Sequence, residues 1–457
     1  VAVDDGLPGS GAEAHWLEEE IRYLIAREGA LRLSWPLGPH DPGDGSQVHT
    51  LAILAPGPEH RGQFRLTFHA PDGRLLRRID LDPTVASRLD TVERIAGQLS
   101  AITGSHGNGS PASWIGTANA PSYDAYTRVH VEVLQSMRED EELQSMPAAE
   151  RVRIVERLER IVRRDPGFAR AHAALALAYL ALRGADEAAL AELATRSARR
   201  ALDVDPELPE AHAALGRIRY RDGLWLAAEE HFLQALAADP AAPSALSAYA
   251  CFLLDMGRLR YAERIGEQAS GLTPGSVAVR ECLALTRIAL GRDDDARETL
   301  GPAGQREPIV IARTRALLLL RAGDAEGAAA ALRAGTRSRV QTGWIDPLLR
   351  AVGRPERTPS ALRGVTQAAA TASIDPGTEI LAGILLGQAD FAFNRLLRAK
   401  RQRRPAPLRY LWIEESQELR QHPRYGATLD ALALPPYWQQ RSRPDYCTLE
   451  RNAIGCD

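Results

Sequence analysis

Residues 210–240 read EAHAALGRIRYRDGLWLAAEEHFLQALAADP, and the spacing inside this stretch returns along the chain. Its last residue is one of several prolines that stand 34 residues apart, and glycines and alanines keep the same step. They are Pro206, Pro240, Pro274 and Pro308, then Gly223, Gly257 and Gly291, then Ala228, Ala262 and Ala296. Glycine ends a helix in a left-handed turn, a small alanine lets two helices approach, and proline cannot continue a helix. The spacing therefore predicts repeated pairs of antiparallel helices.

The same stretch resembles the tetratricopeptide repeat consensus at Leu215, Gly216, Tyr220, Gly223, Ala228, Phe232, Ala235 and Pro240. The resemblance implies a mainly α fold, a tetratricopeptide repeat superhelix with a small N-terminal α+β domain. Such repeats form recognition scaffolds, so the match is specific for fold and not for function.

Composition excludes several classes of protein. The 457 residues suggest two or more domains, and a net charge of −3 favours neither nucleic acid nor an anionic membrane. Lys400 is the only lysine, which excludes a Walker A lysine, a pyridoxal Schiff base and a kinase lysine. No apolar run approaches the ~20 residues that span a bilayer, and no signal peptide is recognisable. The abrupt start at Val1 is consistent with a piece of a longer protein.

Residues 1–104 lack the repeat pattern and predict a small α+β domain. Apolar residues at helical spacing predict helices over 12–27 and 84–102. Short strands are expected over 31–35 and 48–54, and alternation at 64–68 with a return over 75–81 predicts a hairpin. Residues 105–120 are rich in Gly, Ser and Asn and are interpreted as a linker.

The order of these elements resembles the TolB amino-terminal-like domain. The opening Val1-Ala-Val3 looks like its first strand, residues 16–26 (WLEEEIRYLIA) like its first helix, and residues 62–81 like its hairpin. The stretch 38–45 (GPHDPGDG) departs from the family pattern, since it stands where a second helix is expected. In many bacteria this domain precedes tetratricopeptide repeats in ToxR-type membrane-spanning transcription regulators and in some adenylate cyclases.

The rest of the chain predicts helices throughout. Residues 121–335 are assigned to the repeats, with a first pair over 123–146 and 148–164 and an extra turn near 184–190. Residues 336–457 are assigned to degenerate helical repeats, with a last pair over 378–388 and 390–400, and an aromatic tail. Residues 411–425 and 436–447 are similar to the tail of the same TolB-like family. The tail aromatics are expected to cap the open apolar end of the array, as terminal units must. They are Trp412, Tyr425, Tyr437, Trp438 and Tyr446.

The four cysteines predict no zinc site. Cys251 and Cys282 lie inside repeat helices and are interpreted as small buried hydrophobes. Cys447 and Cys456 bracket a short polar tail, where a disulfide is expected if the compartment is oxidising.

No constellation of catalytic residues stands out, and we expect no enzyme activity, cofactor or metal. The acids Asp293 to Asp295 follow a turn glycine, where carboxylates favour a helix N-terminus, so this reading is preferred to a metal site. His172 and His212 occupy the same place in successive repeats, and a packing role is preferred to a ligand role. The basic stretch 398–404 is interpreted as a solvated helix end, with a phosphate or membrane contact as the alternative.

Binding remains as the expected activity. In stacked repeats the first helices line a concave groove, and consensus positions facing it predict a partner-binding surface. Arginine and tyrosine there suit an acidic or carboxylate-bearing peptide, with an ordinary repeat surface as the alternative. The groove residues are Arg170, Glu210, Arg217, Tyr220, Arg221, Asp255 and Glu281.

Three functions remain open from the sequence. The resemblance implies a non-catalytic, periplasmic sensory region that binds a protein or peptide, does not contact nucleic acid itself, and is tethered to a membrane through an upstream segment. The second is a stand-alone scaffold that assembles a complex in the periplasm or cytoplasm. The third is the accessory region of an adenylate cyclase-type enzyme.

Overall fold

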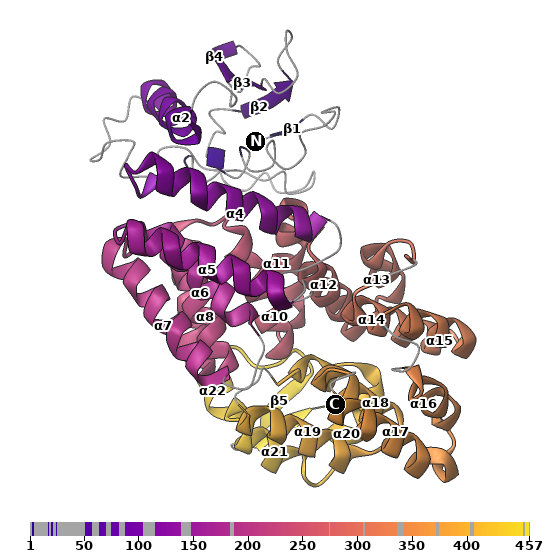
Figure 1. Ribbon diagram of the computed structural model, residues 1–457. Coiled ribbons are helices and arrows are strands. Elements are labelled where there is room, and N and C mark those ends of the chain that lie inside the picture. Colours follow the sequence, from indigo (N-terminus) through magenta and orange to yellow (C-terminus); the bar gives the residue numbers. More distant parts are fainter. Residues whose placement is uncertain are drawn as a thin grey trace. The chain divides into compact units, whose positions relative to one another are not determined.

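The computed structural model describes most of the chain beyond residue 87 and shorter stretches before it (Figure 1). The described residues are 2–3, 17, 20, 21, 24, 51–56, 64–69, 75–81, 87–103, 115–138, 148–182, 187–273, 275–304, 307–335, 342–371, 374–402, 406–450 and 453–456. The predicted strand over 31–35 and the departure at 38–45 lie outside them, as does the predicted helical stretch 139–146.

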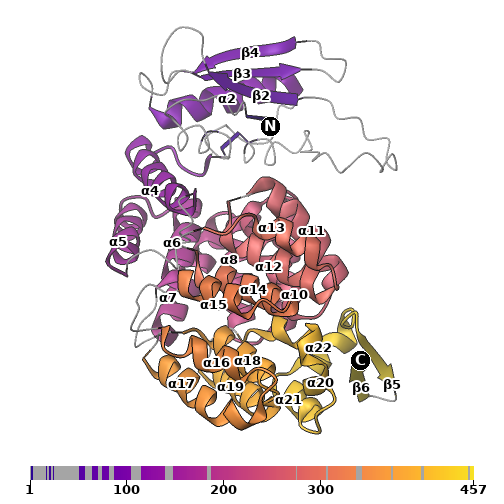
Figure 2. The ribbon, with the colours of Figure 1, turned by 90° about the vertical axis from the view of Figure 1, so that its right-hand side faces the viewer.

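The N-terminal part holds a four-stranded sheet in the order β1-β2-β3-β4, with helix α2 (Arg88–Thr103) against it (Figure 2). The strands are β1 (Ala2–Val3), β2 (Leu51–Pro56), β3 (Phe64–His69) and β4 (Leu75–Leu81). Strand β1 pairs with β2 in parallel, and the other pairs are antiparallel. Leu66 lies opposite Ile79, and both are buried together with Val92 and Ile95 of α2. The predicted hairpin is confirmed, although the helix begins at Arg88 rather than at residue 84.

Helix pairs follow in sequence. They are α4 (Ala120–Arg138) and α5 (Ala148–Arg164), α6 (Ala169–Ala181) and α7 (Glu187–Val204), α8 (Pro209–Arg221) and α9 (Trp225–Ala238), α10 (Pro243–Asp255) and α11 (Leu259–Leu272), α12 (Val277–Ala289) and α13 (Asp293–Leu300), and α14 (Ile309–Arg321) and α15 (Ala325–Ala334). The fold class is confirmed: mainly α, a tetratricopeptide repeat superhelix headed by a small α+β part.

The repeated residues take the predicted places. Gly223, Gly257 and Gly291 have φ of 73°, 76° and 74°, in the left-handed region where a glycine ends the first helix of each pair. Ala228 and Ala262 are buried on the second helices. Pro274 lies outside the described residues.

Shorter helices and a hairpin complete the chain. They are α16 (Ile345–Ala351), η2 (Pro355–Arg357), α17 (Thr358–Ala370), α18 (Pro376–Leu385), α19 (Ala389–Arg401), η3 (Leu408–Leu411), η4 (Glu414–Ser416), α20 (Gln417–Arg420), α21 (Tyr425–Ala431), α22 (Leu434–Gln440), β5 (Cys447–Glu450) and β6 (Ala453–Cys456). Helices α18 and α19 confirm the predicted last pair within a few residues. None of the described helices combines the length and apolar character needed to cross a bilayer.

The chain divides into two compact units, each discontinuous in sequence. The first comprises Val1–Glu139, Met146–Ala214 and Leu233–Ala242, and the second comprises Asp140–Ser145, Leu215–Phe232 and Pro243–Asp457. The domain limits expected at residues 104, 120 and 335 stay predictions.

Candidate functional site

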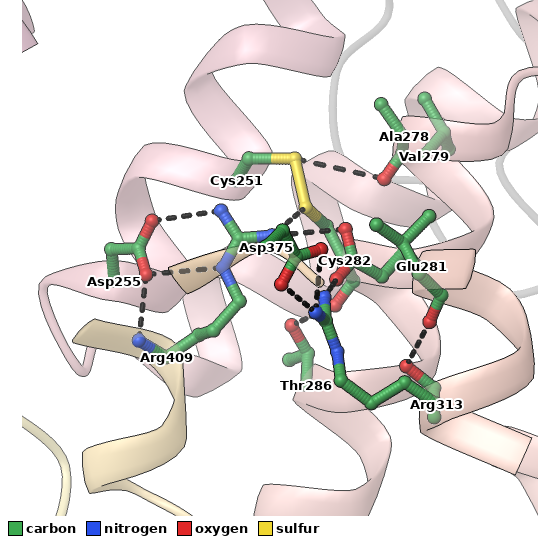
Figure 3. A network of polar contacts seen from close by, with 12 residues as sticks. Cys251, Asp255, Ala278, Val279, Glu281, Cys282, Thr286, Arg313, Asp375 and Arg409 are labelled. Atoms are coloured by element: carbon green, nitrogen blue, oxygen red, sulfur yellow. Dashed lines mark hydrogen bonds and ion pairs between the residues drawn. A yellow bond between two sulfur atoms is a disulfide. The ribbon is translucent and has the colours of Figure 1, made fainter. Parts of the chain in front are cut away.

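The second unit contains a buried network of charged side chains on the first helices of successive repeats (Figure 3). Asp255 ends α10, Glu281 lies on α12, and Arg313 lies on α14. All three are almost fully buried, with exposed fractions of 0%, 6% and 4%. Charges buried to this degree are tolerated only when they are paired and hydrogen-bonded.

Arg409, on the short helix η3, pairs with two of these acids. Its Nη2 lies 2.9 Å from Asp255 Oδ2, and its Nη1 lies 3.1 Å from Glu281 Oε2. Its backbone N–H also donates to Asp255 Oδ1 at 2.6 Å. The side chain and the backbone of one tail residue are therefore both held by the same carboxylate.

Arg313 extends the network to the N-terminus of α18, where Asp375 is the N-cap residue. Its Nη2 lies 3.0 Å from Glu281 Oε1, and its Nη1 lies 2.6 Å from Asp375 Oδ1 and 3.1 Å from Thr378 Oγ1. Glu281 is thus shared by two guanidinium groups, one from a repeat helix and one from the tail. The network brings together residues that are far apart in sequence.

The network shifts the acidity of its members. Burial alone would raise the pKa of Asp375, but Arg313 and the hydrogen bonds from Thr378 hold that pKa below its ordinary value. Burial and the neighbouring Asp255 raise the pKa of Tyr220, whose hydroxyl donates to Asp255. Burial also raises the pKa of Tyr410. Tyr220 therefore stays a neutral donor to Asp255.

Aromatic side chains of the tail pack on the helix pairs α8–α9 and α10–α11. Trp412 and Trp438 donate from their indole nitrogens to the carbonyl oxygens of Asp255 and Met256, each at 3.1 Å. Tyr437 donates to Glu229 Oε2 at 3.0 Å. All three aromatic side chains are nearly fully buried.

These contacts correct the predicted capping role. Tyr425 packs on Phe393 of α19, in the last pair, as a cap would. Trp412, Tyr437 and Trp438 pack instead on the inner repeats, and Tyr446 donates to the carbonyl of Ala289 on α12. The physical reason is space, because Gly257 has no side chain where the Trp412 ring lies.

The structure also corrects the expectation of an open groove in the second unit. Asp255 and Glu281 are covered by Arg409 of the same chain, and the Tyr220 hydroxyl donates to Asp255. Both acids lie on the first helices of their pairs, and the group that covers them belongs to the same chain. No part of the sequence pattern indicated this, since Arg409 is 154 residues from Asp255.

The remaining groove residues differ among themselves. Arg170 of α6 is buried in a two-pronged pair with Glu20, at 2.9 Å and 2.8 Å, so its predicted availability to a partner is corrected as well. Glu210, Arg217 and Arg221 of α8 are half-buried and keep part of their surface in solvent. Their role in binding a partner stays a prediction.

The cysteines of the repeats form a disulfide. Cys251 of α10 and Cys282 of α12 are 31 residues apart, and their Cα atoms lie 5.3 Å from each other. This corrects their interpretation as separate buried hydrophobes. A separation close to one repeat places the two side chains on adjacent first helices, where they meet. Arg409 Nη1 lies 3.3 Å from the Cys282 sulfur, so the disulfide borders the charged network.

The other cysteines lie at the end of the chain. Cys447 is opposite Cys456 in the antiparallel register of β5 and β6. Cys447 is engaged in a disulfide. The pairing of Cys447 with Cys456 stays a prediction.

The histidines and the acidic run have structural partners. Nε2 of His172 lies 3.1 Å from the carbonyl oxygen of Pro166, and Nε2 of His212 lies 2.9 Å from that of Pro206. Each histidine thus ties a first helix to the turn before it. Asp293 to Asp295 lie in the first turn of α13 and pair with Arg321, Arg297 and Arg292, respectively. Within the part of the chain that the structure describes, no group of three or more acidic, histidine or cysteine side chains is arranged to hold a metal.

Comparisons with known proteins concern the fold only. Neither a protein family model nor a curated protein sequence matches the chain. Among solved structures, PilF of Pseudomonas aeruginosa is 22% identical over 55% of this chain and 96% of that chain, with a TM-score of 0.33. PilW, a widely conserved type IV pilus biogenesis factor, is 18% identical with the same coverages and a TM-score of 0.34. The Cut9–Hcn1 hetero-tetramer of the APC/C is 14% identical over 72% of this chain and 60% of that chain, with a TM-score of 0.39.

Proposed function

We propose that this chain is a non-catalytic, protein-binding scaffold of the tetratricopeptide type. The observation that carries the proposal is the series of helix pairs with the same left-handed turn at Gly223, Gly257 and Gly291. Stacked pairs of this kind present a row of helices whose outward side chains vary from repeat to repeat, which suits recognition of another protein. The buried charges of the second unit are paired with each other, so they serve to hold the tail rather than to transform a substrate.

The proposed partner surface is the half-buried face of α8 that carries Arg217 and Arg221. Arg409 already pairs with Asp255 and Glu281, whereas Arg217 and Arg221 keep part of their surface in solvent. Guanidinium groups bind carboxylates in a two-pronged geometry. An acidic protein segment is therefore the kind of partner that we propose.

We further propose that the scaffold works in an oxidising compartment, as the sensory region of a membrane-spanning regulator in the periplasm. The Cys251–Cys282 disulfide supports this compartment, because disulfides persist where thiols are not kept reduced. The resemblance of residues 1–104 and of the tail to the TolB-like family supports the regulator. The sequence encoded upstream of Val1 separates the candidates: a winged helix with one membrane span favours the regulator, and a cyclase domain favours the accessory region.

The binding proposal is tested on the full chain. Proteins of an envelope extract that bind to the chain are identified by mass spectrometry, and the best candidate is purified for measurement of its Kd by calorimetry. The variant R217E/R221E should weaken that Kd at least tenfold, with an unchanged melting temperature. The control R350E/R363E changes the charge equally at exposed positions of α16 and α17 and should bind like the wild type. Equal binding by both variants would show that α8 is not the contact surface.

A further inference from the structure

We propose that the outer edge of strand β4 binds an extended acidic segment of a partner protein. The segment would add a strand beside β4 and place carboxylates on Arg77 and Arg94. This surface lies in the α+β part and is independent of the partner surface proposed on α8.

The edge itself is the first observation. Strand β4 is last in the order β1-β2-β3-β4 and pairs with β3 on one side, and no described strand pairs with its other side (Figure 2). An edge strand carries a row of backbone N–H and C=O groups that can pair with another chain. Peptides that add to such an edge gain main-chain hydrogen bonds, and alternate side chains provide specificity.

A hollow of about 700 Å³ between β4 and α2 is the second observation. Ile79 is buried and Arg77 Nε donates to Gln98 Oε1 of α2 at 2.6 Å, so these alternate residues face the helix. A side chain at Gly97 would meet no atom within 4 Å, which leaves room on the helix side. The hollow is lined by Leu75, Arg77, Arg78, Ile79, Asp80, Arg94, Gly97 and Gln98.

The charge of the hollow indicates the chemistry of its ligand. Three guanidinium groups and one carboxylate line it, and that carboxylate, Asp80, pairs with Arg78 at 3.3 Å. In the part of the chain that the structure describes, no carboxylate of the hollow forms an ion pair with Arg77 or Arg94. These two guanidinium groups therefore give the hollow its positive charge. Leu75, two residues from Arg77 on the strand, is 51% exposed. A segment that alternates acidic and apolar residues offers carboxylates to the arginines and apolar side chains near Leu75.

Other occupants fit the edge less well. A second copy of β4 whose pairing is centred on Arg77 and Arg78 would bring its own arginines against them, and like charges opposite each other destabilise a strand pair. A phosphate-bearing ligand would satisfy the arginines but not the backbone groups of the edge. An acidic strand satisfies both.

The test uses the full chain and a fluorescein-labelled probe peptide of alternating character, Thr-Val-Glu-Val-Glu-Val-Glu-Thr. Fluorescence anisotropy should show saturable binding of this probe and none of the matched peptide with Lys in place of Glu. The variant R77E/R94E should weaken the Kd at least tenfold, and R350E/R363E should not change it. The variant G97E, which places a carboxylate in open space beside the hollow, should weaken binding without loss of helix content.

A second arm separates strand addition from simple charge attraction. The probe is N-methylated at alternate residues in each of the two frames, which removes the donors of one or the other edge. One frame should lose binding and the other should keep it. No saturable binding by the wild type, equal binding of the Lys peptide, unchanged binding to R77E/R94E, or equal binding by both methylated probes would each overturn the proposal.

Discussion

At the scale of single residues, Arg409 has the largest expected effect on stability. It is the counter-charge of Asp255 and one of two counter-charges of Glu281, and both acids are buried. Removal of one member of a buried ion pair leaves an uncompensated charge in a medium that solvates it poorly. The energetic role of Arg409 is thus to keep the acids of α10 and α12 paired.

We predict that R409A lowers the free energy of unfolding by about 3–5 kcal/mol. Urea denaturation followed by circular dichroism measures this. Arg297 is the matched control, because its pair with Asp294 is exposed, and R297A should change the free energy by no more than about 0.5 kcal/mol. Similar values for both variants would mean that the network does not hold the tail.

The side chain of Asp239 makes the free energy of unfolding depend on pH. Burial raises its pKa to about 6 from 3.8, and Glu210 adds to this, while the N–H of Ala241 that donates to Asp239 Oδ1 opposes it. The folded chain then binds this proton more tightly than the unfolded chain does. The contribution of Asp239 to stability is therefore present at low pH and is lost as pH rises through the interval between the two pKa values.

We predict that D239N stabilises the protein by about 1–2 kcal/mol near neutral pH and has little effect near pH 4. Asparagine can still accept the hydrogen bond from Ala241, so the turn should be kept. Thermal melts at both pH values measure the difference between variant and wild type. The control is D205N, at the same position of the preceding repeat, and equal stabilisation there would contradict the assignment to Asp239.

At the scale of elements, the repeated turns share a backbone conformation but have different surroundings. Gly257 and Gly291 have φ of 76° and 74°. A Cβ at Gly257 would lie 2.7 Å from Cβ of Pro444 and 2.9 Å from ring atoms of Trp412, whereas a Cβ at Gly291 would meet nothing within 4 Å. Pro444 and Trp412 of the tail therefore pack against the turn at Gly257, and not against the equivalent turn at Gly291.

We predict that G291A costs about 1–2 kcal/mol, because an L-residue is strained in the left-handed region. G257A should cost about 1–3 kcal/mol more, because it also overpacks the Trp412 contact. Denaturant titrations give both values, and near-ultraviolet circular dichroism should change only for G257A. Equal costs would show that the tail does not pack in this turn.

At the scale of the whole molecule, the Cys251–Cys282 disulfide makes stability depend on the redox compartment. It links two first helices next to the buried network and closes a loop of 31 residues in sequence separation. A cross-link of this kind restricts the unfolded chain and typically raises the free energy of unfolding by about 2–4 kcal/mol. The protein should therefore be most stable where thiols are oxidised.

We predict that dithiothreitol lowers the melting temperature of the wild type, and that C251A/C282A melts lower than the wild type in its absence. The double variant should respond less to the reductant. Mass spectrometry of the non-reduced protein should find the peptide that links Cys251 to Cys282, and also one that links Cys447 to Cys456. Free thiols at Cys251 and Cys282 in protein from the periplasm would argue against the proposed compartment.

Some of these features were predictable because they depend on residues close in sequence. The helix pairs follow from Gly223, Gly257 and Gly291, whose missing side chains allow the turn wherever the glycine recurs. The hairpin of β3 and β4 follows from side-chain alternation in adjacent strands. Local conformational preferences therefore account for the repeats and for the N-terminal sheet.

The partners of the buried acids and cysteines on the first helices depend on contacts that the spacing of residues in the sequence does not reveal. Arg409 reaches Asp255 across 154 residues, and Cys251 meets Cys282 because successive first helices stack side by side. The amino-acid sequence alone determined where the chain bends and which faces of its helices are apolar, since both are properties of short segments. Only the tertiary structure decided that the chain covers its own acids, because that outcome is set by the space beside Gly257 and by the pairing of charges distant in sequence.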